Sequence, residues 1–312
     1  MKTKCMNKNI FKGECILVIV SLLWGSSFLF QKRGMDFIGP FTLGVFRFFL
    51  GALVLTPVVL IFSKRTEKNT KDKDLNRKDT ETKELLKGGI ECGIAMFFAA
   101  SLEQIGLIYT TSGKAGFITS MEIVIVAIIS AIMTRRLLAN TALGIVISMA
   151  GLYMLCLDNG MTFGYGDSIV LFSAAFWAFQ ILLIDKYSKR VDNLKLSLIQ
   201  FIVSGLMSFV CMVLFEEPHI EKIIACTGPI IYTGVIEIAV CYTLQIVGQK
   251  YVPPVISSVT LTLESVFAVI FGALFLHEVL SAREALGCML MLISVIIVQL
   301  PQHRRHMILS HS

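Results

Sequence analysis

The sequence predicts an all-α integral membrane protein whose ten transmembrane helices form two inverted five-helix repeats. First, 55% of the 312 residues are hydrophobic and 16% are charged, whereas soluble domains average about 25% charged residues. Second, the apolar residues form ten runs, each near the roughly 20 residues that a spanning helix needs. Third, related residues recur in the two halves of the chain at a nearly constant offset.

The ten apolar runs are long and continuous, without the alternation that a membrane β-barrel requires. They cover roughly residues 13–31, 38–62, 87–109, 115–134, 139–157, 167–185, 195–215, 229–249, 255–276 and 282–300. The first run follows basic residues, as the core of a signal peptide does. No small-residue cleavage site follows it, so we expect it to be retained as the first helix.

Positive charge is distributed unequally between the connections. If the N-terminus is cytoplasmic, the inner segments hold 22 Lys and Arg residues and the outer loops hold five, while Arg47 lies within a helix. Lys and Arg concentrate in the cytoplasmic loops of membrane proteins. The sequence therefore predicts that both termini are cytoplasmic.

The longest hydrophilic stretch, Ser63 to Glu84, mixes both signs of charge and has no apolar face. We expect residues 63–86 to be a solvated, flexible cytoplasmic linker. The net charge of +6 comes from such connections and not from a basic face interleaved with aromatic residues, so nucleic-acid binding is not expected. The eight Cys and five His residues show no ligand spacing, and neither a metal nor a disulfide framework is predicted.

An internal repeat explains the order of several residues. A shift of 153 residues aligns Gly13-Glu14 with Gly166-Asp167 and Trp24 with Trp177. A shift of 142 aligns Tyr109 with Tyr251 and Glu122 with Glu264. A shift of 143 aligns residues 142–144 with 285–287. The first repeat would comprise residues 1–62 and 87–157, the second 158–300, and a cytoplasmic tail 301–312. Because five is odd, the second repeat would enter the membrane inverted. Inverted repeats with a site near the midplane are typical of secondary transporters.

Ionisable residues at membrane depth are the candidate site residues, because each costs about 2.5–3.5 kcal/mol to insert at the bilayer centre. We expect Glu264 to bind a proton or orient substrate, with Glu122 as its weaker mirror. Arg47 cannot shed its charge. It either forms a structural ion pair with Glu122, Glu264 or Glu103, or clamps a carboxylate of the substrate.

Further polar residues recur at helical spacing in the eighth run. Glu237, Cys241 and Gln245 lie at i, i+4 and i+8, with Tyr242 beside them. This spacing puts the three on one helix face, which we expect to line a cavity. Glu91 lies within a turn of the cytoplasmic end of its run, so we expect its carboxylate to reach water.

Trp24 and Trp177 are the only tryptophans and are related by the repeat. Both fall in mid-helix, although membrane tryptophans favour the interfaces. They either pack helix crossings or stack on an aromatic or cationic substrate. The small residues Gly44 and Gly51, and likewise Gly144 and Ser148, are expected to mark close helix approaches.

Several segments together resemble the EamA family of the drug/metabolite transporter superfamily. They are "LLWGSSF" from Leu22 to Phe28, Arg47, "QIGLIYTTSGKAGFITS" from Gln104 to Ser120, which contains Tyr109 as a further site candidate, and "TLESVFAVIFGALFLHEVLS" from Thr262 to Ser281. The resemblance covers nearly the whole chain except the tails and the charged linker. It implies a bacterial inner-membrane carrier of small metabolites, often an exporter of amino acids or related compounds.

The chain departs from the family at one position. The fourth and ninth helices of the family commonly end in Gly-Glu, whereas the ninth run here ends in His277-Glu278 and the fourth in Arg135-Arg136. The resemblance therefore does not imply a symmetric role at the inner gate for that Glu.

The sequence as a whole predicts a secondary active transporter, with the lipid bilayer and a small-molecule substrate as its partners. Coupling would come from proton exchange or from the substrate's own gradient, because no ATP-binding motif is present. No cofactor is predicted, and no HExxH, GxSxG or His cluster indicates an enzyme. An importer or exchanger, a channel and a scaffold remain alternatives. The oligomeric state is open, a homodimer included.

Overall fold

The computed structural model describes residues 2–68, 75–110, 112–135, 138–156, 164–275 and 281–299, and within these ranges all regular structure is helical. The helices of the first half are α1 (Lys2–Met35), α2 (Pro40–Lys68), α3 (Leu75–Tyr109), α4 (Ser112–Thr119), α5 (Glu122–Thr134) and α6 (Ala139–Cys156). Those of the second half are α7 (Tyr165–Tyr187), α8 (Asn193–Phe215), α9 (Ile220–Ala225), α10 (Thr227–Ile231), η1 (Tyr232–Tyr242), α11 (Thr243–Gln249), α12 (Pro254–Leu261), α13 (Leu263–Phe275) and α14 (Ala282–Gln299).

Each predicted apolar run coincides with one helix or with consecutive helices. Within the described residues, eight such stretches are long and apolar enough to cross a membrane. The fifth run forms α6, whose apolar part is shorter, and the tenth forms α14. The helices also extend beyond the runs, since α2 continues to Lys68 and α3 begins at Leu75. Helix therefore enters both ends of the charged linker.

The fourth and ninth runs are not continuous helices, contrary to the prediction. The fourth breaks between α4 and α5, where the Ser120 hydroxyl donates to the Gly116 carbonyl at 2.8 Å. The ninth breaks between α12 and α13, where the Thr262 hydroxyl donates to the Val259 carbonyl at 2.8 Å. Such side-chain bonds compete with regular helix bonding. Backbone bonds from residue i to i−3 follow each break, from Ile123 to Ser120 and from Ser265 to Thr262, as in the tighter 3₁₀ geometry.

The eighth run is irregular in a different way. Its centre, η1, is a π-helix of 11 residues between α10 and α11. A π-helix bonds residue i to i+5 and often occurs at functional sites. Residues five apart, which point to different sides of an α-helix, can therefore share a face over this stretch.

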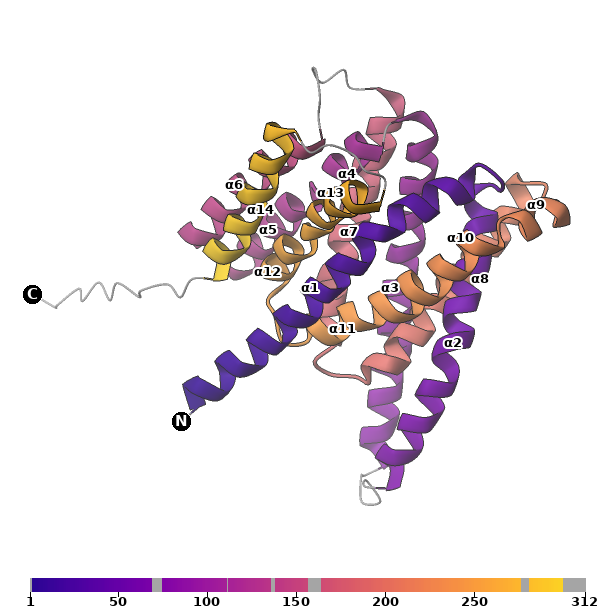
Figure 1. Ribbon diagram of the computed structural model, residues 1–312. Helices are drawn as coiled ribbons and strands as arrows, with labels where there is room; N and C mark the ends of the chain where they lie inside the picture. The colour runs from indigo at the N-terminus through magenta and orange to yellow at the C-terminus, as the bar shows by residue number, and fades with distance from the viewer. Residues whose placement is uncertain are drawn as a thin grey trace, which may run out of the picture.

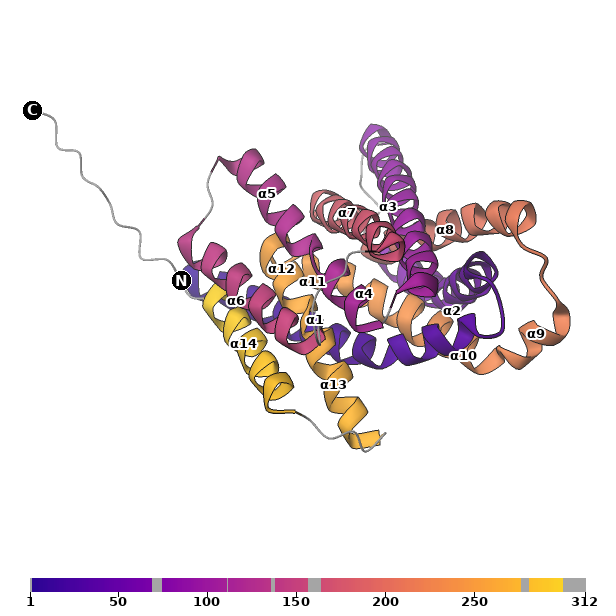
Figure 2. The ribbon, with the colours of Figure 1, turned by 90° about the horizontal axis from the view of Figure 1, so that it is seen from above.

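The helices pack in a pattern that relates the two halves. Helices α6 and α14 lie side by side at one end of the molecule, and α2 and α8 pack together toward the other (Figures 1 and 2). Helix α1 runs diagonally across the view of Figure 1 and packs against η1, α11 and α13. The corresponding helix of the second half, α7, packs against α3, α4 and α5. Helix α1 thus packs on helices of the second half, and α7 on helices of the first half.

Glycine contacts at two crossings correspond residue by residue. A Cβ on Gly13 of α1 would lie 2.9 Å from the Gly248 carbonyl oxygen, and one on Gly166 of α7 would lie 3.0 Å from the Gly106 carbonyl oxygen. The offsets of 153 and 142 relate Gly13 to Gly166 and Gly106 to Gly248. Contacts this short admit no side chain, so glycine sets the distance between the helices at both crossings.

Two contacts at the crossing of α6 and α14 also correspond to each other. A Cβ on Gly144 would lie 3.2 Å from the Ser294 carbonyl oxygen, and one on Gly151 would lie 2.8 Å from the Gly287 carbonyl oxygen. The offset of 143 exchanges these two contacts. The predicted close approaches at Gly44, Gly51 and Gly144 are confirmed, since an added Cβ would meet Ser208, Ile238 and Val298, respectively, within 3.0 Å.

Replacing Gly151 by Ala is expected to lower the free energy of unfolding by about 1–3 kcal/mol, the usual cost of an overpacked site. The new Cβ would meet backbone of α14, at the Gly287 oxygen and at 3.1 Å from the Met291 nitrogen, so the whole helix must shift. The measurement is thermal unfolding of the purified protein in detergent. Gly116→Ala is the matched control, because nothing lies within 4 Å of a Cβ there. Equal melting temperatures for the two variants would contradict the tight crossing.

Candidate functional site

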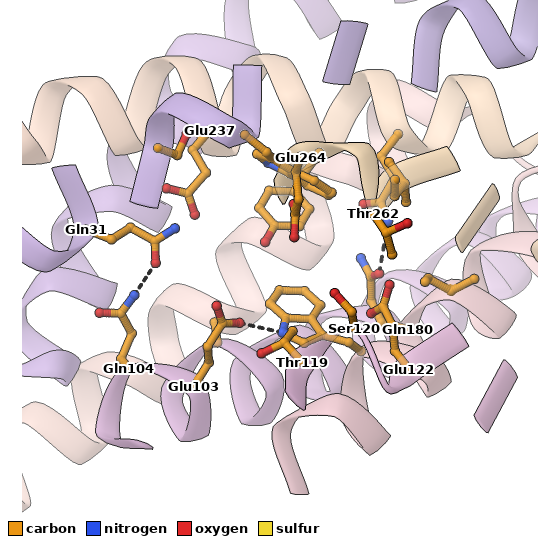
Figure 3. Close-up of a pocket in the computed structure, with 18 of the residues that line it drawn as sticks. Gln31, Glu103, Gln104, Thr119, Ser120, Glu122, Gln180, Glu237, Thr262 and Glu264 are labelled. Carbon is orange, nitrogen blue, oxygen red and sulfur yellow. Dashed lines mark hydrogen bonds between the residues drawn. The ribbon is translucent and has the colours of Figure 1, made fainter. Parts of the chain in front are cut away.

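One polar pocket gathers helices from both halves of the chain (Figure 3). Its lining comes from α1, α2, α3, α4, α5, α7, η1, α11, α12 and α13. The residues are Trp24, Ser27, Gln31, Arg47, Ala100, Glu103, Gln104, Thr119, Ser120, Glu122, Trp177, Gln180, Ile181, Glu237, Tyr242, Gln245, Leu261, Thr262 and Glu264.

Eight of the nine residues predicted from the sequence line this pocket. They are Trp24, Arg47, Glu103, Glu122, Trp177, Glu237, Gln245 and Glu264. The ninth, Tyr109, lies outside it at the end of α3, with 62% of its surface exposed and its ring against Tyr165. The prediction of Tyr109 rests on its place in the repeat and in the segment that resembles the family. Neither of these indicates whether a residue lies inside the helix bundle or at its surface.

Arg47 forms a buried ion pair, but with a residue outside the three predicted partners. Its Nη1 lies 3.2 Å from Oε1 of Glu237, and both side chains are 3% exposed. Glu103, Glu122 and Glu264 are therefore not its partners in this structure. The Arg47 Nε and the second carboxylate oxygen of Glu237 are buried without a hydrogen bond to any described residue. Part of each group thus stays available to a ligand.

Glu103 and Trp177 form a second buried polar contact. The Trp177 indole N–H donates to the Glu103 carboxylate at 2.7 Å (Figure 3). By the repeat offsets, Trp24 corresponds to Trp177 and Gln245 to Glu103. The Trp24 indole nitrogen and the Gln245 side-chain oxygen have no hydrogen-bond partner among the described residues. The hydrogen bond of the Trp177–Glu103 pair thus has no counterpart in the Trp24–Gln245 pair.

The aromatic rings form a wall of the pocket. The Tyr242 ring lies between the two tryptophans, with centroids 4.9 Å from Trp24 and 5.8 Å from Trp177, and it is nearly parallel to Trp177. Glu237 and Tyr242 both line the pocket although they are five residues apart, as the π-helix allows. Cys241 instead packs with Leu17 and Val20 of α1. The predicted stripe of Glu237, Cys241 and Gln245 is therefore wrong at Cys241.

Glu122 and Glu264 occupy equivalent places in the two broken helices. Each lies in the first turn of the second segment, two residues after the hydroxyl residue at the break. Their carboxylates point into the same space as those of Glu103 and Glu237 (Figure 3). Neither forms an ion pair or a hydrogen bond with another described residue. Helix N-termini favour negative charge, so each segment stabilises the carboxylate that it carries.

Several lining residues were not singled out as site candidates from the sequence. They are chiefly Ser27, Gln31, Gln104, Thr119, Ser120, Gln180, Tyr242 and Thr262. Gln31 and Gln104 bond to each other across the pocket, and Gln245 donates to Gln180 at 3.5 Å (Figure 3). A hydroxyl residue lies two positions before the glutamate at both breaks, but Ser101 and Glu103 have the same spacing within the continuous α3, so the sequence offers no signal specific to the breaks.

Glu91 behaves as its position near the cytoplasmic end predicts. Its side chain is 33% exposed, accepts a hydrogen bond from the Tyr187 hydroxyl at 2.8 Å, and lies 3.9 Å from Lys87 and 3.7 Å from Lys186. The glutamate lies outside the pocket and joins the middle of α3 to the end of α7. His277-Glu278 and Arg136 lie outside the described residues.

Comparison with known proteins identifies the family from one family model. The model of the EamA-like transporter family matches the chain twice, over residues 11–157 and 164–300. A solved crystal structure shares the fold with a TM-score of 0.73, covering 92% of this chain and 96% of the other at 15% sequence identity. The double match divides the chain close to the predicted boundary between the repeats.

Two relatives extend over most of the chain. An uncharacterized transporter of Archaeoglobus fulgidus is 31% identical over 289 residues, which cover 91% of this chain and 84% of the relative. The uncharacterized transporter YoaV of Bacillus subtilis is 23% identical over 282 residues, covering 88% and 92%, respectively. With apolar helices around a polar pocket and the family model matched across both halves, the chain belongs to the EamA-like transporter family and is a multi-pass membrane transporter.

Proposed function

We propose that the protein is a secondary active transporter that exports amino acids or related small metabolites by alternating access. One observation carries the proposal: two helices break at corresponding positions, and each break brings a glutamate to one shared polar pocket. Discontinuous helices that line a central site are typical of secondary transporters with inverted repeats. The broken segments would hold substrate while one half moves against the other.

The corresponding contacts support ten spans in two inverted repeats. The contacts of Gly13 and Gly166, and those of Gly144 and Gly151, exchange under the offsets read from the sequence. Two halves that contact each other through corresponding residues can exchange conformations, which would open the pocket first to one side and then to the other. Trp177 is now hydrogen-bonded to Glu103, while Trp24 and Gln245 are not bonded to each other. Such an exchange would form the Trp24–Gln245 bond and break the Trp177–Glu103 bond.

The distribution of charge supports an orientation in the cell membrane with both termini cytoplasmic. The inner segments would hold 22 Lys and Arg residues against five in the outer loops, as the positive-inside rule requires. The linker and the C-terminal tail would then face the cytoplasm. Coupling to protons would use Glu264, with Glu122 in a lesser role.

The proposal is tested by counterflow in vesicles containing the purified protein. Vesicles are loaded with one unlabelled amino acid at a time and diluted into a trace of the same labelled compound. A carrier accumulates label transiently against the gradient and saturates with substrate concentration. Flux that rises linearly with concentration, without transient accumulation, would indicate a channel. Accumulation of label only when the substrate enters from the cytoplasmic face of the protein would indicate an exporter. Accumulation only when it enters from the outer face would indicate an importer.

A further inference from the structure

We infer that the pocket binds organic amines of net positive charge, in preference to zwitterions and anions. The inference rests on the proposed transport function and narrows its substrates, amino acids and related metabolites, to basic amino acids and, in preference to these, the related diamines that lack the carboxylate. Its basis is the balance of charges and of unpaired hydrogen-bonding atoms around the pocket, together with the aromatic wall.

The charge of the pocket is unbalanced. Four carboxyl groups line it, from Glu103, Glu122, Glu237 and Glu264, and among the described lining residues Arg47 alone supplies a fixed positive charge. Its bond to Glu237 neutralises one of the four. Within the described part of the chain, the other three carboxyl groups form no ion pair, and among them only Glu103 accepts a hydrogen bond, from Trp177. Charges buried in a membrane are normally paired, so this arrangement favours a cationic ligand.

The buried polar atoms around the pocket include acceptors that the donors of a ligand could satisfy. Three acceptors have no partner among the described residues, namely the side-chain oxygen of Gln104, Oε2 of Glu237 and the side-chain oxygen of Gln245. All three residues, counted with their backbone, are at most 2% exposed. An unsatisfied buried polar atom costs roughly 1–3 kcal/mol. An ammonium group has three donors and no acceptor, and so satisfies such atoms without adding unpaired ones.

The arrangement also disfavours a free carboxylate on the ligand. The one guanidinium in the lining is held by Glu237 at 3.2 Å, and a second carboxylate there would face the three remaining acids. The unpaired donors are dispersed over three elements, at Trp24, Arg47 and Gln180. They could each contact one polar atom, whereas a bidentate carboxylate needs paired donors.

The carboxyl groups are spread along the pocket and not gathered at one point. Within the described residues, no three acidic, His or Cys side chains converge as ligands for a metal ion. Such spacing suits an extended organic cation with more than one donor group. The rings of Trp24, Tyr242 and Trp177 add π-faces beside these carboxylates, and such faces attract ammonium groups.

The test is a matched set of probes on the full-length protein in vesicles. The probes are 1,5-diaminopentane, lysine, norleucine and glutarate, which have similar chain lengths and net charges from positive to negative. Binding is measured from tryptophan emission, and transport from inhibition of counterflow. We expect the apparent Kd to rise in the order given, with lysine at least about tenfold tighter than norleucine, as one added charge pair would give.

Two matched variants test whether the preference for lysine over norleucine arises in the pocket. Glu122→Gln removes one unpaired carboxylate and is expected to reduce the preference of lysine over norleucine about tenfold. Asp185→Asn removes the same charge outside the pocket, near Lys189, and is expected to leave the preference unchanged. Rescue of the preference by Glu122→Asp would show that it depends on the charge at this position.

Four results would overturn the inference. The first three are norleucine binding as tightly as lysine, competition by glutarate, and absence of binding by both amines at millimolar concentration. The fourth is counterflow of a zwitterion that neither amine inhibits, which would leave the proposed transport function intact. Linear flux without counterflow for any compound would instead overturn the proposed transport function.

Discussion

Replacing Glu264 by Gln is expected to abolish the component of transport that a pH gradient drives. Gln keeps the size and the hydrogen-bonding capacity of the side chain but cannot exchange a proton in the way that a carboxyl group can. In vesicles of the variant, imposing a pH gradient should add no flux to that measured at equal pH. Counterflow at equal pH should persist, because it requires no net movement of protons.

Two further variants make this result specific. Glu122→Gln changes the corresponding residue of the other half and should reduce the pH-driven flux less. Glu221→Gln changes an exposed acid of α9 outside the pocket and should have no effect. Unchanged pH dependence in Glu264→Gln would exclude Glu264 from the coupling step, whatever its contribution to binding.

Replacing Arg47 by Met is expected to lower the free energy of unfolding by about 3–5 kcal/mol, the usual effect of removing one partner of a buried ion pair. Glu237 would be left at 3% exposure without its cation. Glu237→Leu should have a comparable cost, because it leaves the guanidinium unpaired. The measurement is chemical unfolding in mixed micelles, with Arg33→Met on the exposed surface of α1 as the control.

The double variant Arg47→Met with Glu237→Leu distinguishes an ion pair from a substrate clamp. Replacing both members of a buried pair by apolar residues is often nearly neutral for stability, so the double variant should recover most of the loss. The coupling between the two changes should therefore be large. Additive losses would contradict the pair, and a rise in KM without loss of stability in Arg47→Met would identify a clamp.

The positions of the helices could be predicted from the sequence because hydropathy alone defines them. The runs at 167–185 and 195–215 became Tyr165–Tyr187 and Asn193–Phe215. The breaks could not be predicted in this way, since Ser120 and Thr262 interrupt the backbone geometry without interrupting the apolar run. The π-helix of η1 is equally invisible to hydropathy, and its change of register put Tyr242 in the pocket in place of Cys241.

The members of the pocket were easier to predict than their pairing. A polar residue in an apolar run is conspicuous, and eight of the nine candidates line one pocket for that reason. The partner of Arg47 depends on how α2 packs against η1, and Glu237 lies 190 residues away in the chain. No local pattern determines such a contact. Tyr109 is the one candidate that does not line the pocket, although it recurs in the repeat as Tyr251.

The two tryptophans give the protein an internal pair of optical reporters. Trp24 and Trp177 are the only tryptophans in the chain, and both lie against Tyr242. One indole N–H is bound to a carboxylate and the other is not, so their emission spectra should differ. With one tryptophan changed to Phe, each half can be followed separately without any added label. A transition that exchanged the environments of the halves would shift the two emission maxima in opposite directions.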